Sequence, residues 1–294
     1  MFEINAYPLI SIVMPTYNRG YLVMETIESI QKQTYPYWEL LVIDDGSDDN
    51  TAEVIKAIND QRIHYYQQPH YGMERARDHG LSKAKGELIG FMDSDDLWAT
   101  TKLEKQLRVF HEFPDIAFCL TGGYEFKEQD KALVFYYKQN TGWKTGNLFM
   151  SFFKSELVAA TSTLIFRKQC LETTGIPSHI ELAHIHFILE LAARFQGCIL
   201  YEPLHYRRMH ADNYSTLHQT QRHYDGVELI KHYKDKLPRK IFAETLIKSH
   251  INFGEICLKS KKRRKAIKEF FKAWKYKPLN LVPAKKIAKA LFYF

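Results

Sequence analysis

Hydrophobic and polar positions alternate in blocks along the first 115 residues, and the blocks predict strands and helices in turn. Short runs of apolar residues predict strands at residues 9–14, 39–43, 62–66 and 87–92. Between and after them, apolar residues recur at helical spacing and predict helices at residues 21–33, 51–58, 72–85 and 98–110. Strands and helices that alternate in this way are typical of an α/β fold with a mostly parallel sheet.

The pattern becomes less regular after residue 115. It predicts further strands at residues 116–120, 161–166, 198–201 and 204–208, and a helix at residues 183–195. The aromatic stretch 124–146 is expected to form a hairpin or a lid. From about residue 217 the chain is expected to be helical.

Polar side chains follow three of the predicted strands, in the loops at residues 15–18, 44–47 and 93–96. The carboxyl ends of parallel strands meet at one edge of a sheet, so these loops are expected to converge. Clustered carboxylates repel one another unless a cation shares them, and their oxygens suit Mg²⁺ or Mn²⁺, which bridge phosphates. Each loop alone also fits a turn followed by a helix cap, but the three together favour a nucleotide site. The chain has no Gly-rich phosphate loop, so carboxylates and a metal would have to hold the nucleotide.

The stretch from residue 9 to residue 113 resembles the glycosyltransferases of family 2, which have the GT-A fold. The resemblance is carried by the segments at residues 11–19, 33–36, 41–47, 84–96 and 201–210. It implies a Rossmann-like mixed sheet flanked by helices, with a C-terminal helical extension. Residues 1–115 would form the nucleotide-sugar-binding half, residues 116–216 the acceptor-side half of the same domain, and residues 217–294 the extension.

An aromatic ring can stack on a nucleobase, and a carboxylate can accept hydrogen bonds from its N–H groups or from sugar hydroxyls. The resemblance accordingly implies that Tyr17 and Asp45 contact the base and that Asp93 contacts the ribose or the donor sugar. The full nucleotide-binding set expected from the loops is Pro15, Tyr17, Asp44, Asp45, Asp93 and Ser94.

The metal, Mg²⁺ or Mn²⁺, is expected on Asp95, where it would meet the diphosphate. His210 matches a histidine that helps to hold the metal or the diphosphate in some relatives, although a lone histidine also fits a structural role. Arg77 could face a phosphate, but we expect it on a solvated face of its helix.

The general base departs from the family pattern. An inverting transferase needs a group that removes the proton of the acceptor hydroxyl. Relatives carry a Glu-Asp pair before the helix at residues 187–195, whereas this chain has Ala183 and His184. His184 could be the base because imidazole titrates near neutral pH, and Glu181 is the second candidate. A base elsewhere, or binding without efficient transfer, stays open, and His186 is a weaker candidate.

Charge is distributed unequally along the chain. Residues 259–294 carry 13 Lys or Arg and one acid, a net charge of +12 against +7 for the whole chain, so the rest carries −5. Ile267, Phe270, Phe271 and Trp274 fall on one helical face of this basic tail. The tail is therefore expected either to lie on an anionic membrane surface or to pack as a helical hairpin. Nucleic acid is not an expected partner, since the body is acidic and contains no recognition motif.

Together these features predict a metal-dependent, inverting transfer of a sugar from a UDP-, GDP- or dTDP-sugar. The acceptor would be a hydroxyl of a surface glycan or a lipid-linked intermediate. The expected location is the cytoplasm, peripheral to the inner face of the cell membrane. The alternative is a catalytically impaired sugar-nucleotide-binding or assembly protein, suggested by Ala183 and His184. A sugar nucleotidyltransferase fits less well because its Gly-rich, basic N-terminal signature is missing.

Overall fold

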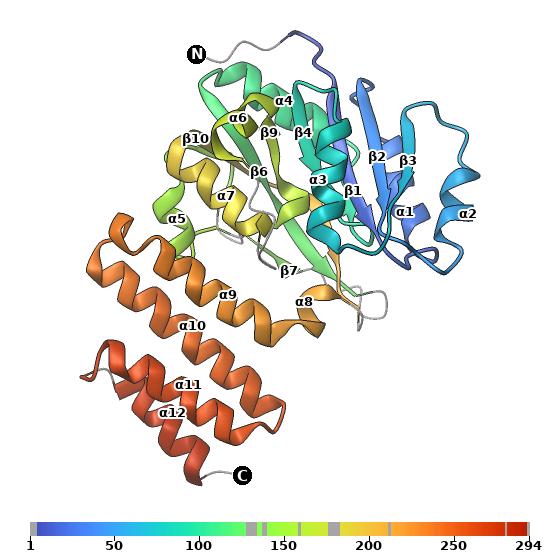
Figure 1. Ribbon diagram of the computed structural model, residues 1–294. Coiled ribbons are helices and arrows are strands. Elements are labelled where there is room, and N and C mark those ends of the chain that lie inside the picture. Colours follow the sequence, from blue (N-terminus) through green and yellow to red (C-terminus); the bar gives the residue numbers. More distant parts are fainter. Residues whose placement is uncertain are drawn as a thin grey trace. The chain divides into compact units, whose positions relative to one another are not determined.

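The computed structural model describes residues 5–127, 134–136, 140–157, 160–175, 183–210, 213–279 and 281–292. The chain divides into two units (Figure 1). The first contains the described residues within 1–149, 158–179 and 183–211, and the second those within 150–157 and 212–294.

The first unit is built on a mixed sheet with the strand order β3-β2-β1-β4-β9-β6-β10-β5 (Figure 1). The bounds are β1 (Ile10–Thr16), β2 (Trp38–Asp44), β3 (Ile63–Gln67), β4 (Leu88–Phe91), β5 (Leu97–Trp98), β6 (Ile116–Phe126), β9 (Ile165–Arg167) and β10 (Gln196–Arg208). Strands β3, β2, β1 and β4 run parallel, and β6 is parallel to β10. Strands β9 and β5 are antiparallel to their neighbours, as are β7 (Val134–Phe135) beside β6 and β8 (Trp143–Gly146) beside β10. The GT-A-like mixed sheet expected from the sequence is confirmed.

Helices cover both faces of this sheet. On one face, α1 (Val23–Gln31) and α4 (Lys102–Glu112) bury their apolar residues against alternate positions of β1 and β2. On the other face lie α3 (Met73–Lys83) and α7 (Ala183–Arg194). Gly80 lets α3 approach closely, because a Cβ there would lie 2.4 Å from Val13 Cγ1. Shorter helices complete the unit: α2 (Thr51–Lys56), α6 (Leu171–Thr174), η1 (Thr161–Thr163) and η2 (Lys168–Cys170).

The second unit is helical in its described part. Its main helices are α9 (Gln219–His232), α10 (Arg239–Lys259), α11 (Arg263–Tyr276) and α12 (Leu281–Phe292), preceded by α8 (Tyr214–Leu217). The short α5 (Phe149–Phe153) leads into this unit, and η3 (Lys234–Lys236) connects α9 with α10. Its core is a cluster of small and apolar side chains: Phe253, Cys257, Ala266, Phe270, Ile287 and Ala290. None of the helices in the described part of the chain combines the length and the apolar character that a membrane span requires.

Two boundaries differ from the sequence-based expectation. Leu97 and Trp98 form β5 rather than the start of a helix, and α4 begins only at Lys102. The indole of Trp98 is buried and donates a hydrogen bond to Ser162 O at 2.8 Å, which holds this segment on the sheet. The two short strands expected around Pro203 form one strand, β10, whose register shifts at this proline. Because proline lacks an N–H group, the strand bulges there without ending.

The aromatic stretch at residues 124–146 is described only in part. Strand β6 continues to Phe126, and β7 and β8 follow. Residues 128–133 and 137–139 lie outside the described residues, so the expected hairpin or lid stays a prediction.

Candidate active site

The carboxyl ends of β1, β2 and β4 bring the three predicted loops to one edge of the sheet. Pro15 pairs with Ile43 in the register of β1 and β2, and Asp45 N donates to Thr16 O at 2.9 Å. The loop after β4 joins them, because Met92 N donates to Val13 O at 3.0 Å. The convergence expected from parallel pairing is therefore seen in the structure.

Asp44 and Asp45 are buried and hold neighbouring loops. Asp44 accepts hydrogen bonds from Tyr65 Oη at 2.5 Å and from Ser47 N at 2.8 Å. Asp45 accepts backbone N–H bonds from Tyr71 at 3.0 Å and from Gly72 at 2.8 Å. Gly72 has φ +94°, a conformation that favours glycine. Asp45 thus fixes the turn that leads into α3.

Tyr17 is partly exposed above this turn. Its side chain is 40% exposed, and its ring stacks on the imidazole of His70 with centroids 4.2 Å apart. Nδ1 of His70 lies 2.9 Å from Asp45 Oδ2. Sequence reasoning missed His70, and only its position between β3 and α3 could have indicated it. The pair presents an aromatic surface next to the buried Asp45.

Asp93 is held by a buried arginine. Arg77, only 3% exposed, donates from Nη2 to Asp93 Oδ1 at 2.8 Å and from Nη1 to Glu74 Oε1 at 2.9 Å. The expectation that Arg77 lies on a solvated helix face was wrong. Burial opposes ionisation of both acids, but the Arg77 cation outweighs it and lowers the pKa of Glu74 and Asp93 below their ordinary values.

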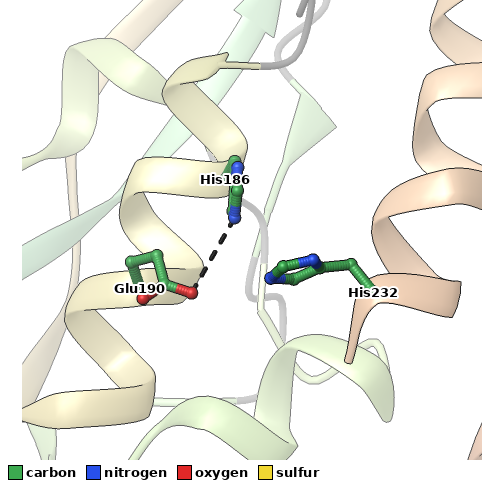
Figure 2. A group of neighbouring side chains, drawn as sticks. All are labelled: His186, Glu190 and His232. Carbon is green, nitrogen blue, oxygen red and sulfur yellow. Dashed lines mark ion pairs between the residues drawn. The ribbon is translucent and has the colours of Figure 1, made fainter. Parts of the chain in front are cut away.

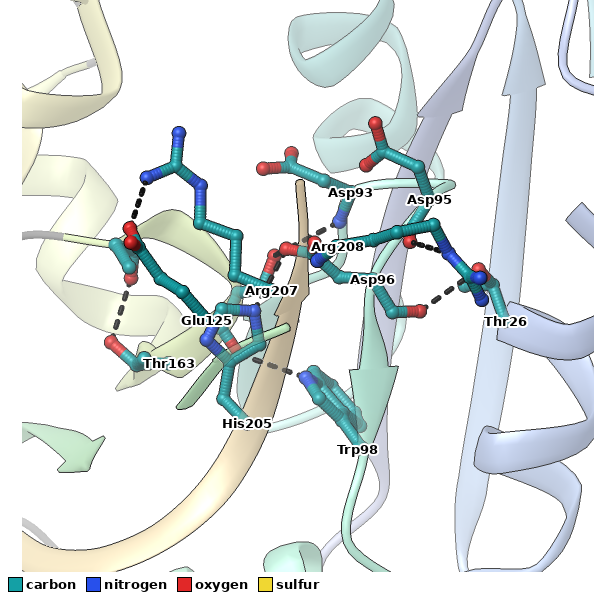
Figure 3. A network of polar contacts seen from close by, with 12 residues as sticks. Thr26, Asp93, Asp95, Asp96, Trp98, Glu125, Thr163, His205, Arg207 and Arg208 are labelled. Carbon is teal, nitrogen blue, oxygen red and sulfur yellow. Dashed lines mark hydrogen bonds and ion pairs between the residues drawn. The ribbon is translucent and has the colours of Figure 1, made fainter. Parts of the chain in front are cut away.

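Asp95 and Asp96 point in different directions (Figure 3). Asp96 turns inward, where its carboxylate lies 2.8 Å from His205 Nε2 and accepts a bond from Arg208 N at 3.1 Å. Both Asp96 and His205 are buried. Asp96 therefore ties the loop after β4 to β10, and this structural contact explains how the loop keeps its shape.

Asp95 projects to the same side as Asp93 in Figure 3. Its Oδ2 lies 2.9 Å from His210 Nε2 and 4.0 Å from Arg19 Nε. Burial, together with the charges of Asp96 and Asp93, raises the pKa of Asp95 to about 6. A carboxylate this poorly compensated, with an imidazole beside it, suits a divalent cation.

Ser94 is buried in the same loop. Its carbonyl oxygen accepts a hydrogen bond from Thr26 Oγ1 at 3.1 Å, and the Asp96 carbonyl accepts from the same hydroxyl at 2.9 Å. These contacts fasten the loop to α1. The backbone of Ser94 thereby supports the positions of Asp93 and Asp95.

His184 lies at the start of α7, on the sheet face that also carries α3. Its Nδ1 is 3.2 Å from Glu74 Oε1 and 3.5 Å from Arg77 Nη1. Burial lowers the pKa of the His184 imidazole below its ordinary value, although the Glu74 carboxylate opposes this shift. The second base candidate, Glu181, lies outside the described residues. Sequence reasoning missed Glu74, which is 110 positions away from its partner.

His186 faces a different partner. Figure 2 shows His186 and Glu190 one turn apart on α7, with His186 Nε2 3.8 Å from Glu190 Oε1. Glu190 also accepts a hydrogen bond from Arg194 Nε at 2.8 Å. His186 therefore contacts a carboxylate of its own helix, and its rank as a weaker base candidate stays a prediction.

The fold and this carboxylate-lined edge define an α/β protein of the GT-A type. The sequence profile of Glycosyl transferase family 2 matches residues 11–172, more than half of the chain. The chain belongs to this family.

Curated relatives match the same N-terminal region. The UDP-Glc:alpha-D-GlcNAc-diphosphoundecaprenol beta-1,3-glucosyltransferase WfgD of Escherichia coli is 44% identical over 100 residues, 34% of this chain and 40% of that protein. The glycosyltransferase GlyG of Streptococcus pneumoniae is 37% identical over 131 residues, 44% of this chain and 43% of that protein. The chain spans half or less of the length of the first curated relatives it matches.

Solved structures share the fold over most of the chain. TarS of S. aureus superposes with a TM-score of 0.67 at 18% identity, covering 92% of this chain and 81% of the TarS fragment. The mannosyltransferase PcManGT from Pyrobaculum calidifontis, solved with GDP-Man and Mn²⁺, gives 0.63 at 18% identity, covering 97% of this chain and 81% of that one. At these identities the likeness establishes the GT-A fold.

Proposed function

We propose that this protein transfers a sugar from a UDP-, GDP- or dTDP-sugar to a hydroxyl of a surface glycan or a lipid-linked intermediate. The observation that carries the proposal is the edge where Tyr17, Asp45, Asp93 and Asp95 converge, with Asp95 beside His210. Aromatic, carboxylate and metal-ligating groups there match the base, the sugars and the diphosphate of one donor. The name of WfgD, which acts from UDP-Glc on a diphosphoundecaprenol-linked sugar, supports a lipid-linked acceptor.

Each part of the donor has a partner in this proposal. The base stacks on Tyr17, whose ring His70 supports from one side. Asp45 accepts a hydrogen bond from the base, while the hydrogen bonds that it accepts from Tyr71 N and Gly72 N keep the loop in place. Asp93, fixed by Arg77, accepts from hydroxyls of the ribose or the donor sugar. Pro15, Asp44 and Ser94 shape the loops around them.

Asp95 and His210 would hold Mg²⁺ or Mn²⁺. The donor set fits, because a carboxylate and an imidazole nitrogen lie 2.9 Å apart and the pKa of Asp95 is raised to about 6 by burial and by neighbouring acids. A bound cation would neutralise charge on the departing diphosphate.

The chemistry proposed is a single in-line displacement with inversion. The acceptor oxygen forms a bond to the anomeric carbon as the bond from that carbon to the diphosphate breaks. His184 takes the acceptor proton, because burial lowers the pKa of its imidazole and favours the neutral form that can accept a proton. Glu181 is the alternative base. Binding without transfer, the non-catalytic alternative, is an outcome that the experiment below separates.

The basic tail is proposed to meet an anionic membrane surface, which would bring the enzyme to a lipid-linked acceptor on the cytoplasmic side. Phe270 packs in the core of the second unit, so only part of the expected apolar face is available. Exposed apolar side chains remain next to exposed lysines: Phe271, Trp274, Leu279, Leu281, Val282 and Leu291. Lysines on lipid phosphates with aromatics in the interface are typical of peripheral binding. Sedimentation with anionic and with neutral vesicles tests this, and equal binding to both would contradict it.

The function is tested by incubating the protein with a panel of nucleotide sugars and Mn²⁺ and measuring release of the nucleoside diphosphate. We expect release from one donor, its loss in Asp95→Asn, and unchanged release in Asp115→Asn, an exposed aspartate of the same unit. Donor binding without release, even with membrane extract as acceptor, would favour the non-catalytic alternative.

A further inference from the structure

A partly buried carboxylate lies against the candidate base. Glu74 on α3 and His184 on α7 are brought together on one face of the sheet, with 3.2 Å between Glu74 Oε1 and His184 Nδ1. The Glu74 side chain is 15% exposed and that of His184 is 9% exposed. Arg77 Nη1 donates to the same Glu74 oxygen at 2.9 Å and so fixes the carboxylate.

This contact determines the tautomer of the imidazole. A carboxylate oxygen accepts hydrogen bonds only, so Nδ1 beside Glu74 is the nitrogen that carries the proton. Arg77 Nη1 is farther away, at 3.5 Å, and donates to Glu74 instead. Nε2 then has the lone pair, and it makes no hydrogen bond to any other described residue. The nitrogen left available is the one that can accept a proton from a substrate.

Burial and the neighbouring charges together lower the pKa of the His184 imidazole below its ordinary value. Among the described residues, the charged groups that face His184 are Glu74, Arg77 and Asp93. Burial and the Arg77 cation lower the imidazole pKa, whereas the two carboxylates raise it. Glu74 therefore has two effects: it orients the ring, and it stabilises the imidazolium that forms when Nε2 takes a proton.

We propose that Glu74 is a positioning residue that holds His184 in the tautomer and orientation needed for a general base. The inference rests on the proposed transferase function. In the step itself, the acceptor oxygen bonds to the anomeric carbon and its proton moves to His184 Nε2. The carbon–oxygen bond to the diphosphate breaks, and its electron pair leaves with the nucleoside diphosphate. Glu74 stays ionised throughout and touches neither the donor nor the acceptor.

A double-mutant cycle tests this role. Its variants are Glu74→Gln, His184→Ala and the double variant, with Glu53→Gln on the exposed side of α2 as the matched control. Glutamine keeps an oxygen that can accept the hydrogen bond from Arg77. An unchanged donor affinity and an unchanged melting temperature would show that the fold is intact. We expect kcat to fall about tenfold in Glu74→Gln and about a hundredfold in His184→Ala, with donor KM within about twofold.

The cycle separates positioning from general structural support. If Glu74 acts through His184, the double variant is no slower than His184→Ala alone. The acidic limb of the kcat profile should also move to lower pH in Glu74→Gln, because the carboxylate that raises the imidazole pKa is gone. A further tenfold loss in the double variant, or an unmoved acidic limb, would overturn the inference.

The same measurements distinguish a failure of this inference from a failure of the proposed transferase function. Full turnover by His184→Ala would remove both the base and its positioning residue while leaving the transferase assignment intact. Donor binding by the wild type with no turnover of any donor would instead contradict the transferase function itself.

Discussion

Replacing Arg77 by methionine should destabilise the first unit strongly, because it removes the cation between two carboxylates. Arg77 is 3% exposed and lies 2.9 Å from Glu74 and 2.8 Å from Asp93. Breaking a buried ion pair by removing one partner costs about 3–5 kcal/mol. The Asp93 side chain is 35% exposed, so water screens part of the loss, and we expect about 3 kcal/mol, near the lower end of the range.

The matched control is Arg75→Met, an exposed arginine on the same helix. A loss of about 3 kcal/mol corresponds to a melting temperature lower by about 6–12 °C in a domain of this size. Tryptophan fluorescence reports mainly on the first unit, which contains Trp38, Trp98 and Trp143. A difference below about 1 kcal/mol between the two variants would refute the argument that Arg77 neutralises buried charge.

The same variant has a pH signature whose sign follows from the pKa shifts. Arg77 lowers the pKa of Glu74 and Asp93, so its stabilisation is present above their unfolded pKa values and is lost as the pH falls through the folded ones. Without the cation, burial raises the pKa values of both carboxyl groups. As the pH falls, their protonation removes the uncompensated negative charge and so reduces the destabilisation of the folded variant. The gap in unfolding free energy between wild type and Arg77→Met should therefore narrow between neutral pH and about pH 5. A gap that widens would contradict this.

Two further predictions use neighbouring residues as controls. Phe270→Ala should cost about 3–5 kcal/mol of stability in urea unfolding because it empties the core of the second unit, whereas exposed Phe271→Ala should stay within about 0.5 kcal/mol; equal losses would contradict the core assignment. Tyr17→Ala should weaken nucleotide binding about tenfold to a hundredfold in calorimetric titration, while Tyr21→Ala, exposed nearby, should not. Unchanged affinity in Tyr17→Ala would exclude base stacking on Tyr17.

The sequence was sufficient to predict the arrangement of the strand-end loops. Apolar runs marked β1, β2 and β4, and parallel pairing then required the loops after them to share one edge. The burial of Arg77 could also have been predicted from the sequence. Ala76, Gly80 and Leu81 mark the inner face of α3, and Arg77 lies on that face, although its charge alone favours a solvated position.

Other features depend on contacts that a single sequence does not record. Glu74 and His184 are 110 positions apart, and only the packing of α3 and α7 on one face brings them together. Phe270 and Phe271 are adjacent on the predicted apolar face, yet the cluster formed with α10 and α12 includes only Phe270. Helical periodicity gives the direction of a side chain but not which neighbours cover it.

The most direct test of the account is the mass of the acceptor after incubation with the donor identified by nucleotide release. Membrane extract supplies lipid-linked acceptors, and mass spectrometry should find one that gains the mass of a single sugar residue with wild type and none with Asp95→Asn. Nucleoside diphosphate released without any such gain would show that the edge formed by Tyr17, Asp45, Asp93 and Asp95 binds and cleaves a donor but does not transfer its sugar.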